Sequence, residues 1–237
     1  MPVLTISGQT GSRAREIGRL TAQHLQIDYV DQEILVEAAR QLGVPVETVV
    51  TKDERPVTRG QRLAAMFRRF LERSAAAGAA DPMLGSGGLD IVLGRTYGEA
   101  AAAAEGLQEV SDEQYISTLN GIMHELAAHG DVLIIGRGSQ VSLSDWPGAT
   151  HVLLAAPYDQ RAAFIAQRDG MNPDDAAKRV HDGDKGRSSF HDKFFKVHVD
   201  DSALYHITLN TGRFSDEEAA GLIADVAHRV AGAHQSA

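Results

Sequence analysis

Apolar residues along this chain follow two alternating patterns, one typical of buried strands and one typical of amphipathic helices. Short apolar, β-branched runs predict five strands; they cover residues 3–6, 26–31, 132–135, 151–155 and 206–210. Between them, apolar side chains recur at helical spacing; the expected helices are 17–25, 32–42, 111–129, 158–168, one from 172 and one from 215. Strands that alternate with helices predict an α/β fold whose parallel sheet is covered on both faces.

Capping residues mark several of these helix ends. Ser111–Gln114 and Ser215–Glu218 have the spacing of a capping box, in which the first and fourth residues bond each other's backbone amides. Asn172 followed by Pro173 is typical of a helix start. Gly43 is expected to end the helix before it.

The segment after the first strand, Gly8 to Glu16, joins a strand to a helix through a glycine-bearing turn. Amides at a helix N-terminus face such a turn and can bind an anion, so the segment predicts a phosphate cradle. Laid on the usual motif G-x-x-x-x-G-K-[ST], the segment has Arg13 for the second glycine, Ala14 for the lysine and Arg15 for the hydroxyl residue. The alternative is a plain strand-to-helix turn at a sheet edge.

Two further polar groups follow predicted strands. Asp31 ends the second strand, and Gly136-Arg137-Gly138 follows the third. In open α/β sheets, ligands bind beyond the carboxyl ends of the strands, so these groups and the Gly8 segment are expected at one edge. For Arg137, the alternative to a role at this edge is an ion pair with a helix. Asp31 is predicted to line the same site, or else to cap the following helix.

Composition limits the classes of function. The 237 residues carry a net charge of −9, which argues against a nucleic-acid coat. The absence of cysteine excludes disulfides, thiolate metal sites and a cysteine nucleophile. No apolar run reaches the roughly 20 residues that span a membrane, and the N-terminus has no signal-like segment. We expect a cytoplasmic protein without a membrane partner.

Residues 52–110 differ from the rest in composition. Five arginines, at 59, 62, 68, 69 and 73, flank apolar residues of a predicted helix. This stripe is read as a solvated face, with a phosphate grip or an interface in a homo-oligomer as alternatives. Residues 74–110 are rich in Ala and Gly and have little to bury, so they are expected to form a mobile or partner-dependent insert, or a spacer without function.

Several motifs together resemble the P-loop nucleoside monophosphate kinases, and most closely the cytidylate kinase-like family. The resemblance covers the chain except residues 52–110. It rests on Ser7–Ser12, Arg15–Ile17, Asp28–Leu35, Ile134–Gly138, Arg161-Ala162, Asp184-Lys185-x-Arg187 and Leu209–Thr211.

The resemblance implies a three-layer P-loop NTPase fold with a five-stranded sheet of order 2-3-1-4-5. The core would be 1–51 and 111–237, with a helical insert at 52–110 and a lid at about 158–200. It also implies transfer of a phosphoryl group from ATP, with Mg²⁺, to a nucleoside monophosphate, CMP or dCMP by likeness. Such transfer depends on positioning and electrostatics.

Residue roles are assigned by matching positions. ATP phosphates would lie on Gly8, Gln9, Thr10, Gly11, Ser12, Arg13, Ala14 and Arg15. The predicted catalytic residues are Arg13, Arg15, Arg168 and Arg187. The acceptor would contact Asp31, Arg137, Arg161, Arg179 and Lys185.

The chain departs from the family pattern where metal and phosphate contacts are expected. Ala14 and Arg15 replace the usual Lys and Ser/Thr, and Gly138 stands where cytidylate kinases proper carry Asp. Ser12 is the nearest hydroxyl. Histidines 181, 191, 198 and 206 fall in an expected loop and strand without metal-ligand spacing, so no protein metal site is predicted. Two alternatives to the kinase remain: a non-catalytic nucleotide-binding module, and a kinase of another small acceptor.

Overall fold

A computed structural model of the chain describes residues 2–44, 49, 52 and 110–235. These residues belong to two compact units, one of residues 1–31 and 120–237 and the other of residues 32–119. The first unit contains the sheet and the candidate site. The predicted insert 52–110 and its arginine stripe lie almost wholly outside the described residues, so the predicted domain boundaries and the interface on that stripe stay predictions.

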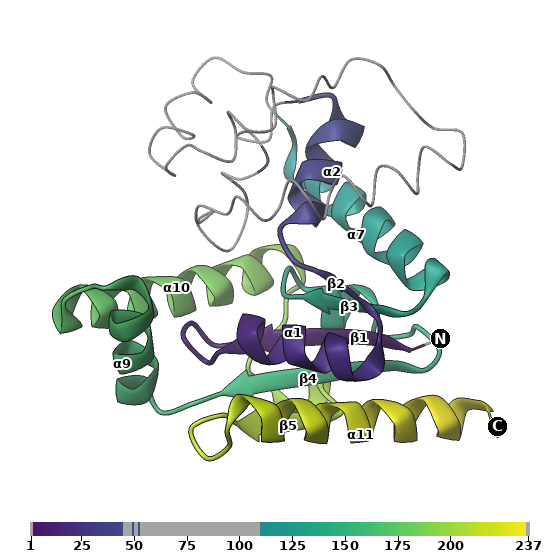
Figure 1. Cartoon of the computed structure of the whole chain (residues 1–237). Helices are drawn as coiled ribbons and strands as arrows, with labels where there is room; N and C mark the ends of the chain where they lie inside the picture. The colour runs from purple at the N-terminus through teal and green to yellow at the C-terminus, as the bar shows by residue number, and fades with distance from the viewer. Residues whose placement is uncertain (1, 45–48, 50–51, 53–109, 236–237) are drawn as a thin grey trace, which may run out of the picture. The chain divides into compact units, whose positions relative to one another are not determined.

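Five parallel strands form the sheet of the first unit (Figure 1). They are β1 (Val3–Gly8), β2 (Asp28–Val30), β3 (Val132–Ile135), β4 (Ala149–Ala155) and β5 (Ile207–Asn210). Their order in the sheet is β2-β3-β1-β4-β5, as the resemblance implied. The central strand β1 pairs with β3 and β4, with Val3 opposite Val132 and Ala149. Both the parallel α/β prediction and the strand order are confirmed.

One face of the sheet carries the main hydrophobic core. Helices α1 (Ala14–Leu25) and α11 (Asp216–Gln235) pack on this face. Leu4 and Ile6 of β1 meet Ile17 of α1 and Ile223 of α11 there, all four with essentially no exposure. Since successive side chains of a strand point to opposite faces, this alternation fixes the direction of every other residue of β1.

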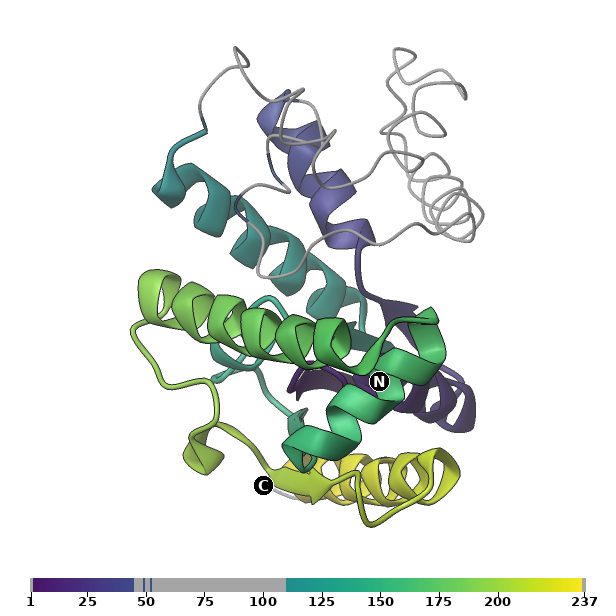
Figure 2. The same ribbon diagram turned by 90° about the vertical axis from the view of Figure 1, so that its left-hand side faces the viewer.

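The face of β1 that points away from α1 and α11 carries polar side chains. The Thr5 hydroxyl lies 2.8 Å from Nδ1 of His151, and the Ser7 hydroxyl accepts a bond from Arg187 of α10 (Pro173–Phe194). Figure 2 shows α1 and α10 on opposite sides of the sheet. The sheet is therefore covered on both faces. Polar side chains of β1 point towards the side on which α10 lies.

The remaining helices are divided between the two units. In the first unit they are α8 (Ser139–Ser142), α9 (Tyr158–Asp169) and the 3-10 turn η1 (Ser202–Leu204). Helix α2 (Glu33–Leu42) belongs to the second unit, and α7 (Asp112–His129) begins in the second unit and ends in the first. None of the helices among the described residues is long and apolar enough to cross a membrane.

The predicted helix ends are confirmed in detail. Ser111 and Gln114 exchange the two bonds of a capping box, and so do Ser215 and Glu218. Gly43 caps α2 in the left-handed conformation. The bonds to Ser215 also lower the pKa of the Glu218 carboxyl, because they favour its ionised form.

One prediction about this region is wrong. His181 and His191 were expected in a loop, but α10 continues through both of them to Phe194. Gly183 faces the Thr10 side chain so closely that a Cβ atom would lie 2.4 Å from the Thr10 hydroxyl. Tertiary packing therefore keeps this segment helical despite the low helix propensity of glycine.

The start of α10 supports a first prediction. The Asn172 side chain accepts a hydrogen bond from the Asp175 amide at 2.8 Å, and Pro173 is the first residue of the helix. Replacing Asn172 with alanine removes this cap and is expected to lower the free energy of unfolding by about 1 kcal/mol. Urea denaturation followed by circular dichroism measures the change. Lys178→Ala, an exposed position further along α10, is the control and should leave the midpoint within error; equal effects of the two variants would contradict the cap.

Candidate functional site

The loop of residues 8–13, called here the Gly8 loop, joins β1 to α1 at the carboxyl edge of the sheet. Gln9 donates to the Leu154 carbonyl of β4, and the Ser12 amide donates back to Gln9. A Cβ on Gly8 would lie 2.5 Å from the Cβ of Ala14 and 2.7 Å from the Ser12 hydroxyl. Only glycine therefore permits the loop to fold back this tightly over the strand end.

Arg13 takes the backbone conformation of a glycine. Its φ of 63° and ψ of 25° are left-handed, a conformation that costs an ordinary residue roughly 1–2 kcal/mol. It precedes α1 as the N-cap residue and gives the helix no side-chain cap. The loop thus keeps a glycine-type turn where the usual motif has its second glycine. The first amides of α1, which have no partner within the helix, are left to face an anion.

Ser12 carries an unsatisfied hydroxyl inside the loop. The residue is 1% exposed, and its Oγ has no hydrogen-bond partner among the described residues. A buried hydroxyl without a protein partner costs free energy, so the Ser12 hydroxyl is available to a ligand that enters beside the Gly8 backbone. Because Arg15 replaces the Ser or Thr of the usual motif, Ser12 carries the hydroxyl nearest to that position.

The tip of the Gly8 loop is held by two helices. The Asp184 carboxylate of α10 accepts a hydrogen bond from the Thr10 amide at 2.9 Å and forms an ion pair with Arg161 of α9 at 2.7 Å. Arg161 also donates to the Thr10 carbonyl and to the Ala156 carbonyl, at 2.9 Å each. Helices α9 and α10 pack against each other as a hairpin (Figure 2). The hairpin grips both backbone polar groups of Thr10.

Arg187 reaches the base of the same loop from α10. Its side chain, 6% exposed, bonds the Ser7 hydroxyl at 3.0 Å and pairs with Asp200 at 2.7 Å. Its Nε is buried and has no partner among the described residues. A buried guanidinium with one unused donor therefore lies beside the residue that precedes the Gly8 loop.

Asp31 and Arg137 meet at the carboxyl edge, as their positions after β2 and β3 predicted. Arg137 is fully buried; its Nη1 donates to the Asp31 carboxylate at 3.0 Å and to the Asp31 carbonyl at 2.7 Å. The second carboxylate oxygen lies 2.8 Å from Nε of Arg15. Asp31 thus joins two arginines, and Gln32 rather than Asp31 is the N-cap of α2.

A second group of charges lies where α9 and α10 meet near α1. Arg168 bonds Asp169 and approaches Glu16 to 3.8 Å, and Arg179 pairs with Asp169 at 2.8 Å. The hydrogen bond from Arg168 lowers the pKa of Asp169, and the field of Arg179 and Arg15 adds to this effect. The same bond raises the pKa of Arg168. Lys185 lies exposed on α10.

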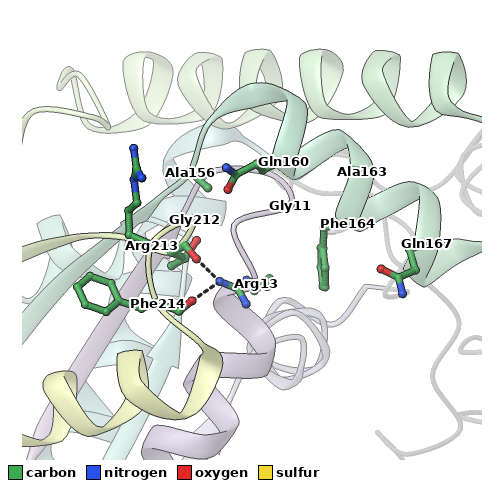
Figure 3. A pocket seen from close by; sticks show the side chains of 11 residues that line it. Gly11, Arg13, Ala156, Gln160, Ala163, Phe164, Gln167, Gly212, Arg213 and Phe214 are labelled. Carbon is green, nitrogen blue, oxygen red and sulfur yellow. Dashed lines mark hydrogen bonds between the residues drawn. The ribbon is translucent and has the colours of Figure 1, made fainter.

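A cavity of about 500 Å³ opens beside the Gly8 loop (Figure 3). Three segments line it: the loop, α9 and the turn after β5. The lining residues are Gly11, Arg13, Ala156, Gln160, Ala163, Phe164, Gln167, Thr211, Gly212, Arg213 and Phe214. Its walls combine an aromatic ring, aliphatic surface and glutamine amides, a lining that suits a flat heterocycle with polar edges.

These features together define a three-layer P-loop fold, with the phosphate-type loop between the first strand and helix of a 2-3-1-4-5 sheet. The chain belongs to the cytidylate kinase-like family, whose model matches residues 3–213. Membership supports a phosphotransferase of the nucleotide-kinase type.

Individual relatives are distant. A protein of Methanopyrus kandleri named cytidylate kinase is 28% identical over 102 residues, which are 40% of this chain and 53% of that protein. The match thus spans about half the length of this curated relative. An uncharacterized protein from Eubacterium ventriosum has 14% identity and a TM-score of 0.61 over 96% of this chain and 99% of its own. Shikimate kinase from Acinetobacter baumannii, at 14% identity over 97% of this chain and 94% of its own, has a TM-score of 0.45.

The predicted site residues thus lie in one unit, at or near one edge, but their roles stay predictions. Arg137 is enclosed with Asp31, so a phosphate contact there requires the pair to open. Apart from Asp31, sequence reasoning missed the acids that hold the arginines in place. Asp184 and Asp216 lay inside quoted motifs but were given no such role, whereas Asp169 and Asp200 carried no signal beyond their charge.

Proposed function

We propose that this protein transfers a phosphoryl group from ATP, in the presence of Mg²⁺, to a nucleoside monophosphate, with CMP or dCMP as the acceptor. One observation carries the proposal: a cavity large enough for a nucleobase opens at the Gly8 loop, and arginines line the same edge of the unit. The name of the Methanopyrus kandleri relative supports the choice of CMP.

The donor would lie along the loop with its base in the cavity. Phe164 offers a ring for stacking, and Gln160 and Gln167 offer amide donors and acceptors to the base. The phosphates would follow the backbone amides from Thr10 to Arg15, because amides at a helix N-terminus bind anions. Asp184 accepts the Thr10 amide in this structure, so a phosphate at that amide would have to displace its carboxylate.

Mg²⁺ fits this site as an ion held chiefly by its substrate. Among the described residues no three His, Asp or Glu side chains gather to hold a metal, and Mg²⁺ commonly uses few protein ligands together with phosphates and water. Ser12, with its unpartnered buried hydroxyl, is the residue that would contribute a ligand. The ion supplies neutralisation of phosphate charge when bound.

The chain's own part in the reaction is positioning and charge stabilisation. Arg15 and Arg168, whose side chains are 23% and 35% exposed, can turn from their acidic partners towards a transferring phosphoryl group. Arg187 holds a positive charge beside Ser7, below the loop. Arg179 and Lys185 of the hairpin would approach an acceptor phosphate, and Asp31 and Arg137 would complete the acceptor side. Arg161 is buried in its contacts with Thr10 and Asp184, so it would reach a phosphate only after release from Asp184.

A second candidate function is nucleotide binding without catalysis. The arginines of the site are engaged with acids of the protein itself, and no lysine stands at Ala14. A module that senses a nucleotide needs the cavity and the loop amides but no transferring machinery. Phosphorylation of a different small acceptor keeps the donor site and changes only the acceptor side.

An assay with ATP, Mg²⁺ and a panel of acceptors tests the proposal. The panel contains CMP, dCMP, UMP, AMP, GMP and small alcohols, and mass spectrometry identifies the product. We expect CMP or dCMP to become its diphosphate, and Arg15→Ala to lower kcat/KM at least about 100-fold, in the range found for loss of one charge-stabilising donor. Arg19→Ala removes the same charge from an exposed position of α1 and is the matched control.

The outcomes separate the candidates. Product from a small alcohol alone would replace the monophosphate acceptor with another one. ATP binding without any phosphorylated product would favour the non-catalytic module. An equal loss of activity in Arg15→Ala and Arg19→Ala would remove Arg15 from the proposed machinery.

A further inference from the structure

Arg13 occupies a position of the Gly8 loop that favours glycine, yet its side chain makes several contacts. The residue keeps the left-handed backbone that the turn needs, with φ at 63°. A side chain that persists at such a strained position is expected where its own contacts offset the strain. The direction of those contacts therefore tells what the residue does.

The Arg13 guanidinium points away from the loop interior and into the turn after β5 (Figure 3). Nη2 donates to the carbonyls of Thr211 and Phe214, the latter at 2.8 Å, and Nη1 lies 2.7 Å from the Asp216 carboxylate. Both terminal nitrogens are thus used by protein acceptors. A planar fork of donors suits this arrangement of two carbonyls and an acid, which a lysine could satisfy only in part.

The turn that Arg13 holds is one wall of the cavity. Thr211 has a second anchor, because its amide donates to the Ala155 carbonyl of β4 at 2.8 Å. The Phe214 carbonyl and Asp216 lie further along the turn, and Arg13 bonds both of them. Gly11 and Arg13 line the same cavity. Arg13 therefore links the wall that meets a base with the loop that meets phosphates.

We propose that Arg13 is a positioning residue that sets the base end of the cavity against the Gly8 loop, so that a nucleotide is recognised as base and phosphates together. The inference rests on the nucleotide binding proposed above. It gives Arg13 a role different from the phosphate contact that its place in the sequence predicted. It also makes the turn 211–216 a determinant of selectivity for the donor.

Two ligands separate the roles. ATP uses the base wall and the loop, whereas inorganic tripolyphosphate carries the phosphates alone. If Arg13 positions the wall, its loss weakens the binding of ATP and leaves the binding of tripolyphosphate nearly unchanged. If Arg13 binds phosphate, its loss weakens both ligands alike.

Isothermal titration calorimetry of the full chain with each ligand, at fixed Mg²⁺ concentration, makes the comparison. Arg13→Gly is the main variant, because glycine favours the left-handed backbone and so removes the side chain without straining the loop. We expect its Kd for ATP to rise about tenfold or more and its Kd for tripolyphosphate to change less than about threefold; tenfold corresponds to the loss of one well-made charged contact. Unfolding temperatures of the variants check that the fold is intact.

A matched pair tests the acidic partner. Asp216→Asn removes the charge that Arg13 contacts. It should raise the Kd for ATP about threefold without changing the Kd for tripolyphosphate. Glu217→Gln removes the same charge one residue along, where the side chain meets His24 instead, and should change neither Kd. Equal weakening of both ligands by Arg13→Gly, or unchanged ATP binding in that variant, would overturn the positioning role. A wild-type protein that binds neither ligand would instead refute the proposed nucleotide site itself.

Discussion

Replacing Asp31 with alanine is expected to lower the free energy of unfolding by about 3–5 kcal/mol, the cost of removing one partner from a buried ion pair. Asp31 is 5% exposed and Arg137 is fully buried, so the guanidinium loses a bonded carboxylate in a place that water does not reach. Arg15 also loses this contact, but its side chain is 23% exposed and can turn to solvent. The loss at Arg137 therefore dominates.

Chemical denaturation of three variants measures this effect. Arg137→Met should cost less than Asp31→Ala, because Asp31 keeps its contact with Arg15. The double variant Asp31→Leu with Arg137→Met should recover much of the loss, since two apolar side chains need no charged partner. A cost for Asp31→Ala below about 1 kcal/mol, the usual worth of a surface ion pair, would show that the pair is solvated. It would then be open to phosphate, as the sequence predicted for Arg137.

Acidification is expected to destabilise the protein through His151. Burial and, to a smaller extent, the charge of the neighbouring His206 lower the pKa of His151 to about 4. In the unfolded chain the imidazole titrates at its ordinary 6.5. Between these values the unfolded state binds a proton that the folded state does not, so stability is full above pH 6.5 and falls as the pH decreases towards 4. The slope approaches about 1.4 kcal/mol per pH unit, roughly 3 kcal/mol in total.

Urea denaturation at several pH values from 5 to 7 tests this expectation, in a window mostly above the titration of ordinary carboxyl groups. His151→Phe fills the space on β4 with a ring that cannot ionise, so its stability should depend less on pH than that of the wild type. His206 also has a pKa lowered by burial, and it should leave a smaller dependence of the same sign in the variant. Equal slopes for the two proteins would show that His151 is not the source.

Local sequence signals determined the architecture. Apolar runs of strand length, helical periodicity and capping residues predicted the strands, most helix ends and the parallel α/β class, because each depends on residues close in sequence. The order of the strands and their shared edge came from the resemblance and from the rule that ligands bind at carboxyl ends. On this basis Asp31 and Arg137 could be expected near each other, and they are in contact.

The partners of each charged side chain were decided only by the tertiary structure. Arginine is long and has several donors, so the sequence could name Arg13, Arg161 and Arg187 as site residues but not the directions of their side chains. Packing fixed those directions: Gly183 fits against Thr10 and brings Asp184 to the loop tip. The sequence placed Arg13 in a phosphate-type loop, and the fold turned its guanidinium towards Thr211, Phe214 and Asp216, because only the folded chain brings acceptors more than 190 residues away within hydrogen-bond distance.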